Sequence, residues 1–130
     1  MAKIEKKYYT VQDKEDLKLL HQHIVESDIL AVDTETTGLN PRKDKIVGWS
    51  VSGDEGIGFY LPTLVWNFDK GELELQTIDG TSTETISRNL LNLLKGKKLV
   101  FHNASFDVQF IKNYLGVDLL PDVWVDTGLL

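Results

Sequence analysis

Asp33 and Glu35 are two acidic residues, two positions apart, that directly follow the short apolar run at residues 29–32. We expect that run to be a strand. Side chains at positions i and i+2 of an extended segment point to the same side, so the two carboxylates would converge at the carboxyl end of the strand. Carboxylate oxygens are ligands that suit Mg²⁺ or Mn²⁺. On spacing alone, an acidic loop beside a turn is an equal alternative.

A second polar cluster lies in Phe101-His102-Asn103-Ala104-Ser105-Phe106-Asp107, where a strand is expected to lead into a helix. Asn103 and Asp107 are four residues apart, which puts them on one helix face or on a face and its cap. A helix start explains them equally well, with Asn103 as the cap and Asp107 favourable in the first turn. Two such clusters, each at the end of an expected buried strand, favour a common site.

The apolar pattern predicts the elements that position these clusters, in the order strand, helix, three strands, helix, strand, helix, strand. The run 29–32 has no polar alternation, which predicts a strand buried on both faces. The three consecutive strands are expected to form an antiparallel meander. The expected strands are residues 8–11, 29–32, 46–52, 57–61, 99–101 and 122–126, and the expected helices are residues 14–27, 82–94 and 105–114.

Local signals set the ends of these elements. Asp13 is expected to cap the first helix, and Thr81 with Glu84 has capping-box spacing before the second. Gly116 is expected to stop the third helix. Residues 67–83 are predicted to be a long loop with a short hairpin around residues 73–75. The whole pattern predicts an α/β domain with a mixed sheet and helices packed against it.

Composition limits the functions that fit this pattern. The length of 130 residues suits one domain, residues 1–130, and the absence of cysteine excludes disulfides and thiolate metal sites. The formal net charge of −6 argues against broad electrostatic binding of nucleic acid, so metal ions would have to mediate contact with a polynucleotide. No apolar run reaches the ~20 residues of a membrane helix, and no signal peptide is evident. We expect a cytoplasmic protein without a membrane partner.

Three segments resemble the DEDD 3′–5′ exonucleases, in particular the proofreading domain of family A DNA polymerases, the DNA polymerase I type. Asp33-Thr34-Glu35-Thr36-Thr37-Gly38-Leu39 is similar to the first motif of that family, and His102-Asn103-Ala104-Ser105-Phe106-Asp107 is similar to the second. Asp126-Thr127 resembles a strand-end pair that precedes the next helix. The similarity covers roughly residues 8–130 and implies a ribonuclease H-like fold, with an antiparallel meander plus parallel strands flanked by helices.

The resemblance implies a metal-dependent hydrolase that releases nucleoside monophosphates from the 3′ end of DNA. Two divalent ions, Mg²⁺ or Mn²⁺, would act together on the scissile phosphate. Asp33 would ligate both ions, Glu35 would ligate one and help to position the attacking water, and Asp107 would ligate the second. These three residues are the expected catalytic and metal-binding residues.

The resemblance also implies residues that bind the substrate, a single-stranded or frayed 3′ end of DNA. Thr36 would contact the 3′-terminal sugar, Leu39 would wedge against the terminal bases, and Asn103 would approach the backbone. A hydrophobic residue that covers the turn is the alternative for Leu39. A polymerase domain would be the partner in the parent protein. RNA is an open alternative to DNA, because nothing in the sequence places a contact to the 2′-hydroxyl.

The family's third motif, a Tyr or His four residues before a final Asp, is not found after Asp107. Tyr114 and Asp118 have that spacing, but Gly116 between them would break the helix that the motif needs. We interpret Tyr114 as a packing residue and Asp118 as a loop acid, and we expect Asp126 to support structure. The domain thus resembles the N-terminal portion of the family's domain, and we expect it to have little or no activity alone.

Two further expectations follow. Helices that the family places after this portion would cover one face of the sheet, so we expect exposed apolar surface and self-association into a homo-oligomer. The alternatives to a proofreading exonuclease are a ribonuclease D-like RNA exonuclease and a non-catalytic nucleic-acid-binding or scaffolding module. The presence of all three carboxylates favours an enzyme over the scaffold.

Overall fold

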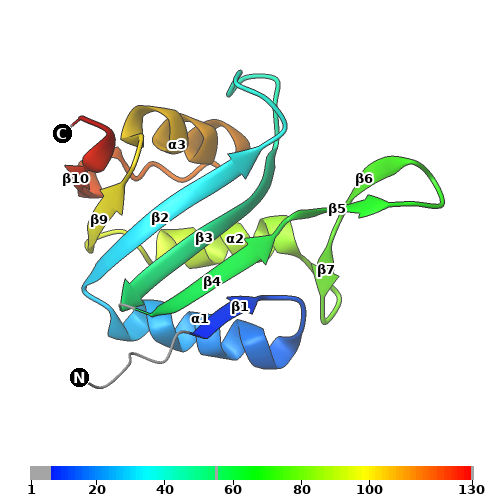
Figure 1. The fold of residues 1–130 in the computed structure, drawn as a ribbon, viewed down its shortest axis with the longest axis horizontal. Coiled ribbons are helices and arrows are strands. Elements are labelled where there is room, and N and C mark those ends of the chain that lie inside the picture. Colours follow the sequence, from blue (N-terminus) through cyan, green and yellow to red (C-terminus); the bar gives the residue numbers. More distant parts are fainter. Residues whose placement is uncertain (1–6, 55, 130) are drawn as a thin grey trace.

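The computed structural model describes residues 7–54 and 56–129, and its centre is a six-stranded mixed sheet in the order β1-β4-β3-β2-β9-β10 (Figure 1). β2, β3 and β4 form the predicted antiparallel meander. β9 and β10 extend the sheet in parallel beyond β2, and β1 pairs in parallel with β4 at the opposite edge. The strands are β1 (Lys7–Thr10), β2 (Ile29–Thr36), β3 (Ile46–Asp54), β4 (Ile57–Pro62), β9 (Lys98–Phe101) and β10 (Val123–Asp126).

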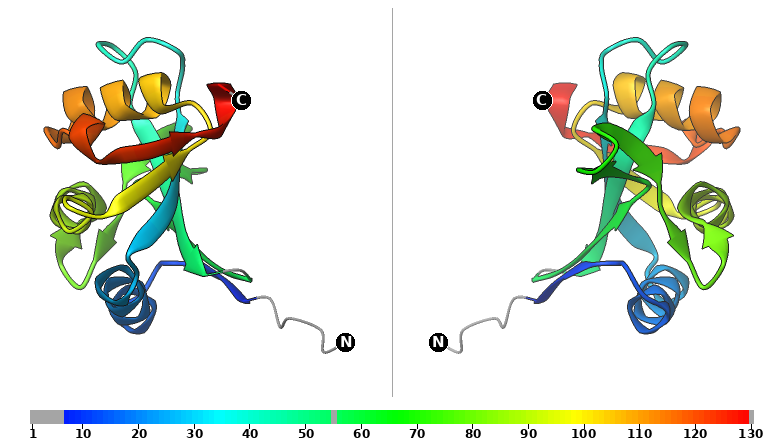
Figure 2. Two further views of the ribbon diagram at one scale, coloured as in Figure 1. Left: turned by 90° about the vertical axis from the view of Figure 1, so that its left-hand side faces the viewer. Right: turned by 90° about the vertical axis from the view of Figure 1, so that its right-hand side faces the viewer.

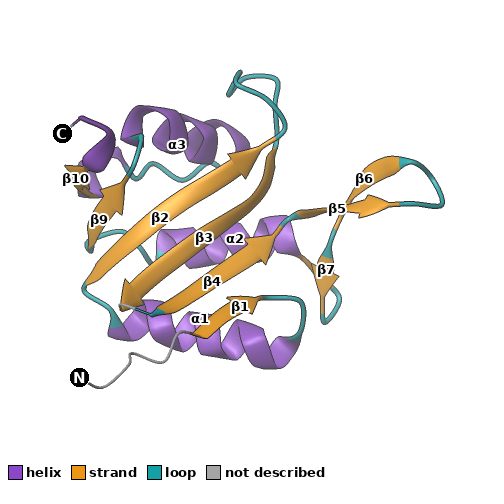
Figure 3. Ribbon diagram, in the orientation of Figure 1, coloured by secondary structure: helices purple, strands orange, loops and turns teal. Residues whose placement is uncertain are grey.

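Among the described residues, three α-helices lie together on one side of this sheet, and no α-helix covers its other side (Figure 2; helices purple and strands orange in Figure 3). They are α1 (Lys14–Glu26), α2 (Thr83–Asn92) and α3 (Ala104–Phe110), and α3 continues as a π-helical segment (Ile111–Leu115). The core lies between the two layers, where Trp49, Phe101 and Phe110 are the largest fully buried side chains. The strands therefore have one buried face and one exposed face.

Helix ends follow the local signals closely. The Asp13 side chain accepts a hydrogen bond of 2.8 Å from the backbone N–H of Asp16, which begins α1. Asn103 caps α3, and Gly116 ends the following segment with a φ of 74°, a left-handed conformation that favours glycine. The predicted cap at Thr81 is wrong, because Thr81 pairs with Ile78 in a short hairpin and Ser82 caps α2 instead.

The prediction that residues 29–32 are buried on both faces is wrong, because all three helices pack against one side of the sheet. Leu30 and Val32 face the core, whereas Ile29 and Ala31 are exposed. The strand also continues further than expected. Asp33 and Glu35 lie inside β2, paired with Ser50 and Gly48 of β3, and not beyond the strand's end.

Residues 67–83 are more regular than the predicted loop. β5 (Leu64–Asn67) pairs with β6 (Glu72–Leu75), and β7 (Thr77–Ile78) pairs with β8 (Thr81–Ser82). The β5–β6 hairpin extends away from the main sheet (Figure 1). The expected short hairpin at residues 73–75 is one strand of it. Among the described residues, no helix is long and apolar enough to cross a membrane.

Replacing Ser87 with alanine should destabilise the packing of α2 on the sheet. Ser87 is fully buried, and its hydroxyl accepts a hydrogen bond of 2.8 Å from the indole N–H of the buried Trp49 on β3. A buried donor left without a partner costs about 1–3 kcal/mol. We expect a loss of that size in the free energy of unfolding, measured by urea denaturation. Ser105→Ala, on the exposed side of α3, is the control and should change little; an equal loss there would contradict the prediction.

Candidate active site

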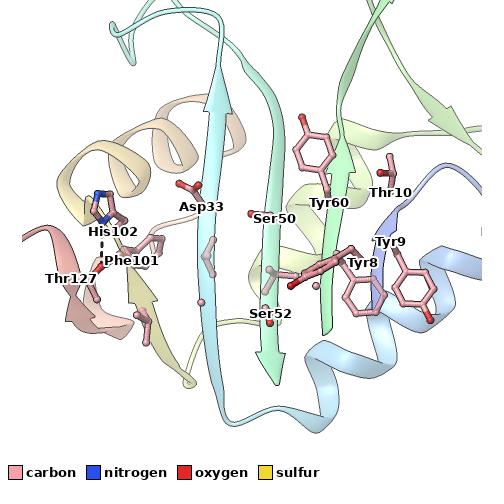
Figure 4. Close-up of a pocket in the computed structure, with 16 residues that line it drawn as sticks. Tyr8, Tyr9, Thr10, Asp33, Ser50, Ser52, Tyr60, Phe101, His102 and Thr127 are labelled. Carbon is pink, nitrogen blue, oxygen red and sulfur yellow. Dashed lines mark hydrogen bonds between the residues drawn. The ribbon is translucent and has the colours of Figure 1, made fainter. Parts of the chain in front are cut away.

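Asp33 and Glu35 project from β2 onto the open face of the sheet. Both are exposed, because alternate residues of the strand face the helices and these two do not. Asp33 borders a hollow of about 510 Å³ that runs across this face, with Ser50, Tyr60 and His102 also in its lining (Figure 4). The structure thus brings together the first two predicted ligands on an accessible surface.

Asp107 lies on the other side of β2, in the first turn of α3. Its side chain is 2% exposed, and one carboxylate oxygen accepts a hydrogen bond from the hydroxyl of Thr34, the inward-facing residue between Asp33 and Glu35. Burial raises the pKa of the Asp107 carboxyl to about 6, and hydrogen bonding from Thr34 opposes the rise. The negative charges of Asp33 and Asp126 raise this pKa further, so the carboxylates lie close enough to repel one another.

The chemistry of the carboxylate groups of Asp33, Glu35 and Asp107 fits a hard divalent cation. Asp33 and Glu35 present carboxylate oxygens without an ion pair to any described Lys or Arg, and nearby like charges create a field that a cation would neutralise. The geometry is only partly assembled. Within residues 7–54 and 56–129, no three His, Cys, Asp or Glu side chains come together as a metal-binding group. Asp33 and Glu35 are the pair that shares a face, and Asp107 is turned toward Thr34.

Tyr60 lies beside Glu35, and the sequence analysis did not predict it as a site residue. It extends from β4, and its hydroxyl donates a hydrogen bond of 3.2 Å to Oε2 of Glu35. Burial and the adjacent Glu35 charge raise the pKa of the Tyr60 phenol to about 12, so it remains a donor at neutral pH. The signal that could have found it is Gly48, a glycine inside a strand, which often marks a close approach of other atoms.

The second motif is held by the end of β10. One carboxylate oxygen of Asp126 accepts from the backbone N–H of Ala104 at 3.0 Å, and the other accepts from that of Gly128 at 2.9 Å. The Asn103 side chain accepts from the N–H of Phe106 at 3.4 Å. Asp126 therefore ties the last strand to the start of α3, which confirms its predicted structural role. Asn103 is exposed and caps the helix, and its contact with a substrate remains a prediction.

The other two predicted substrate residues lie where β2 leaves the sheet. The Thr36 hydroxyl donates to the carbonyl oxygen of Gly38 at 2.7 Å, which shapes the turn. Leu39 is 85% exposed beyond that turn. A leucine that covered the turn would be largely buried, so the alternative interpretation of Leu39 does not fit. Its side chain is free to contact another molecule.

Tyr114 and Asp118 do not form the family's third motif. The Tyr114 hydroxyl donates to Glu84 at 3.2 Å, and its ring packs against the core. Asp118 accepts from the backbone N–H of Leu120 at 3.0 Å, within a loop. Gly116 separates the two in a left-handed conformation. The predicted roles of packing residue and loop acid are confirmed.

Comparison with known proteins gives a match to a family model. The model described as "3′-5′ exonuclease" matches residues 8–127. DNA polymerase I of Borreliella burgdorferi is 27% identical over 108 residues, which are 82% of this chain and 11% of the polymerase. The chain therefore spans only a small part of that relative.

Two solved structures have the same fold. NrnC of Brucella melitensis has a TM-score of 0.57 and 22% sequence identity, over 94% of this chain and 49% of that one. The ribonuclease D of Trypanosoma brucei, solved in complex with RNA U12, has a TM-score of 0.60 and 17% identity, over 94% of this chain and 38% of that one. These likenesses confirm the expected ribonuclease H-like mixed sheet.

Proposed function

This chain belongs to the 3′-5′ exonuclease family, whose model matches residues 8–127, and on that premise we propose that it acts in the metal-dependent removal of nucleotides from the 3′ end of DNA, as the proofreading domain of a DNA polymerase. The observation that carries the proposal is the pair Asp33 and Glu35. Both carboxylates project side by side from β2 onto an open surface, and neither is neutralised by a described Lys or Arg.

Asp33 and Glu35 would hold Mg²⁺ or Mn²⁺, with Asp107 as the third carboxylate of the site. When bound, such ions supply an acidified water and stabilise charge at the scissile phosphate. The protein's own contribution is to fix the ligands on a rigid element. Asp33 and Glu35 lie within the β2–β3 ladder, where each is paired across to β3. Leu39, which is exposed beyond the turn that follows β2, would contact the terminal bases.

DNA is proposed over RNA because the sequence relative is a DNA polymerase I. The Trypanosoma brucei ribonuclease D, which was solved with RNA, shares the fold at 17% identity. RNA is therefore the second candidate substrate. Within a polymerase, the polymerase domain would supply the primer strand to this site.

A pair of 5′-labelled single strands, one DNA and one RNA of the same sequence, tests both candidates. Each is incubated at high protein concentration with Mn²⁺ or Mg²⁺, and products are resolved by length. We expect slow shortening of the DNA from its 3′ end, with release of nucleoside 5′-monophosphates, and none in EDTA.

The other outcomes discriminate between the alternatives. Faster shortening of the RNA would favour the ribonuclease D-like function. Shortening from the 5′ end, or activity that persists in EDTA, would contradict the proposal. No shortening together with no calorimetric heat of Mn²⁺ binding would favour the non-catalytic scaffold.

A further inference from the structure

Tyr60 reaches Glu35 across an intervening strand. Glu35 on β2 is paired with Gly48 on β3, and Gly48 is paired with Pro62 on β4. Tyr60 itself lies opposite Ser50, two residues along β3 from Gly48. Its side chain must therefore lean along the open face of the sheet and pass over β3 to meet the carboxylate. Figure 4 shows the Tyr60 ring on this face, on the same side of the sheet as Asp33.

Gly48 is what makes this crossing possible. A Cβ atom at this position would lie 2.1 Å from the Tyr60 hydroxyl oxygen and 2.4 Å from the ring carbon that bears it, closer than real Cβ contacts allow. The glycine is buried despite its place on the open face, as expected if the tyrosine side chain covers it. Gly48 is not among the glycines with positive φ, so space and not backbone conformation requires a glycine here.

The contact leaves half of the Glu35 carboxylate available. The Tyr60 phenol donates to Oε2 of Glu35. Oε1 accepts no hydrogen bond from the described residues. A glutamate side chain on an exposed strand face has several rotamers, and a donor fixed on a neighbouring strand restricts them. Hydrogen bonds of this kind orient metal-ligating carboxylates, and their loss weakens metal binding.

We propose that Tyr60 is a positioning residue for Glu35: its hydroxyl, laid over Gly48, holds Oε2 so that Oε1 is presented to the divalent cation. This inference rests on the proposed metal-binding function of Asp33 and Glu35. It assigns one shared task to the three strands of the meander: β2 carries the ligand, β3 provides the space for the tyrosine and β4 carries the tyrosine that restrains the ligand.

The chain provides a matched control. Tyr114 donates to Glu84 at 3.2 Å, the same distance and the same pair of groups, but on the helical side of the molecule. Its phenol pKa is also raised to about 12 by burial and by its glutamate. Tyr60→Phe and Tyr114→Phe thus remove chemically equivalent hydrogen bonds, of which one involves a proposed metal ligand.

Mn²⁺ affinity, measured by titration calorimetry on the whole chain, is the readout, with urea denaturation of each variant alongside. We expect Tyr60→Phe to weaken Mn²⁺ binding by about tenfold, and Tyr114→Phe to leave it unchanged. In a Glu35→Gln background the Tyr60→Phe change should have no further effect, because the oriented group is gone. Gly48→Ala, which displaces the ring, should weaken binding as Tyr60→Phe does.

Two results would overturn the proposal and leave the proposed function intact. In the first, Glu35→Gln weakens Mn²⁺ binding and Tyr60→Phe does not. In the second, Tyr114→Phe weakens Mn²⁺ binding as much as Tyr60→Phe does. A loss from Tyr60→Phe that persists in the Glu35→Gln background would also overturn it. A wild-type chain that binds no Mn²⁺ would overturn the proposed function and this inference together.

Discussion

Asp33→Asn should weaken Mn²⁺ binding by at least about 100-fold and remove the 3′-end shortening of DNA. Loss of a partner that merely orients a metal ligand costs 10–100-fold, and loss of the ligand itself should cost no less. The substitution keeps the size of the side chain and removes its charge. Because Asp33 is exposed on a strand that is otherwise well packed, the free energy of unfolding should change by less than about 0.5 kcal/mol. Calorimetry, the DNA assay and urea denaturation measure the three quantities.

Asp28→Asn is the matched control for this experiment. Asp28 is also exposed, and it lies just before the opposite end of β2. The same chemical change there should leave Mn²⁺ affinity and DNA shortening as in the wild type. If Asp33→Asn retained wild-type affinity for Mn²⁺, or if both variants lost that affinity equally, the assignment of the metal site to the open face of β2 would be wrong.

The elements that carry this site were largely predictable because their signals are local. Asp13 and Asn103 each cap the helix that follows, and Gly116 ends the last helical segment in the expected conformation. The meander was visible in its alternating residues and in the turn before Ile57. Spacing of two along a strand also placed Asp33 and Glu35 correctly on one face. Such features depend on a few neighbouring residues, so the sequence specifies them directly.

The burial of β2 was not predictable from its own residues. Ile29 and Ala31 are apolar yet face outward, because the described helices lie on one side of the sheet only. A run without polar residues is expected for burial on both faces, so the pattern could not distinguish a covered face from an open one. The extension of the strand through Asp33 depends on pairing with Ser50, which is distant in sequence.

The side-chain contacts of the carboxylates were also not predictable from the sequence. Spacing of four put Asp107 in the first turn of a helix, but the sequence did not indicate that its side chain would turn inward to Thr34. That contact joins residues 73 positions apart. The Tyr60–Glu35 contact spans three strands and requires the glycine at position 48. Side-chain partners of this kind follow from the three-dimensional register and not from local spacing.

Asp107→Asn should stabilise the metal-free protein at neutral and alkaline pH. The folded pKa of about 6 lies above the ordinary value of 3.8, so the unfolded chain loses this proton first as the pH rises. Ionisation of the buried carboxylate then costs stability, and this cost grows between about pH 4 and pH 6 and stays constant above about pH 7. The shift corresponds to about 3 kcal/mol at pH 8 and about 1 kcal/mol at pH 4.5. An asparagine retains an oxygen for the Thr34 hydroxyl and has no charge to bury.

Urea denaturation from pH 4.5 to pH 8 measures this effect, with Asp28→Asn as the control that should follow the wild type. A stability gain that is independent of pH, or a loss at pH 8, would contradict the prediction. Saturating Mn²⁺ should then reduce the difference in free energy of unfolding between the variant and the wild type. An ion that binds only the folded state stabilises the wild type by mass action, and the variant, which lacks one proposed ligand, should gain less. If Asp107 is a metal ligand, its buried carboxylate destabilises the metal-free protein and a bound cation offsets that cost. If Asp107 is purely structural, the pH dependence would be the same, and Mn²⁺ would stabilise the variant and the wild type equally.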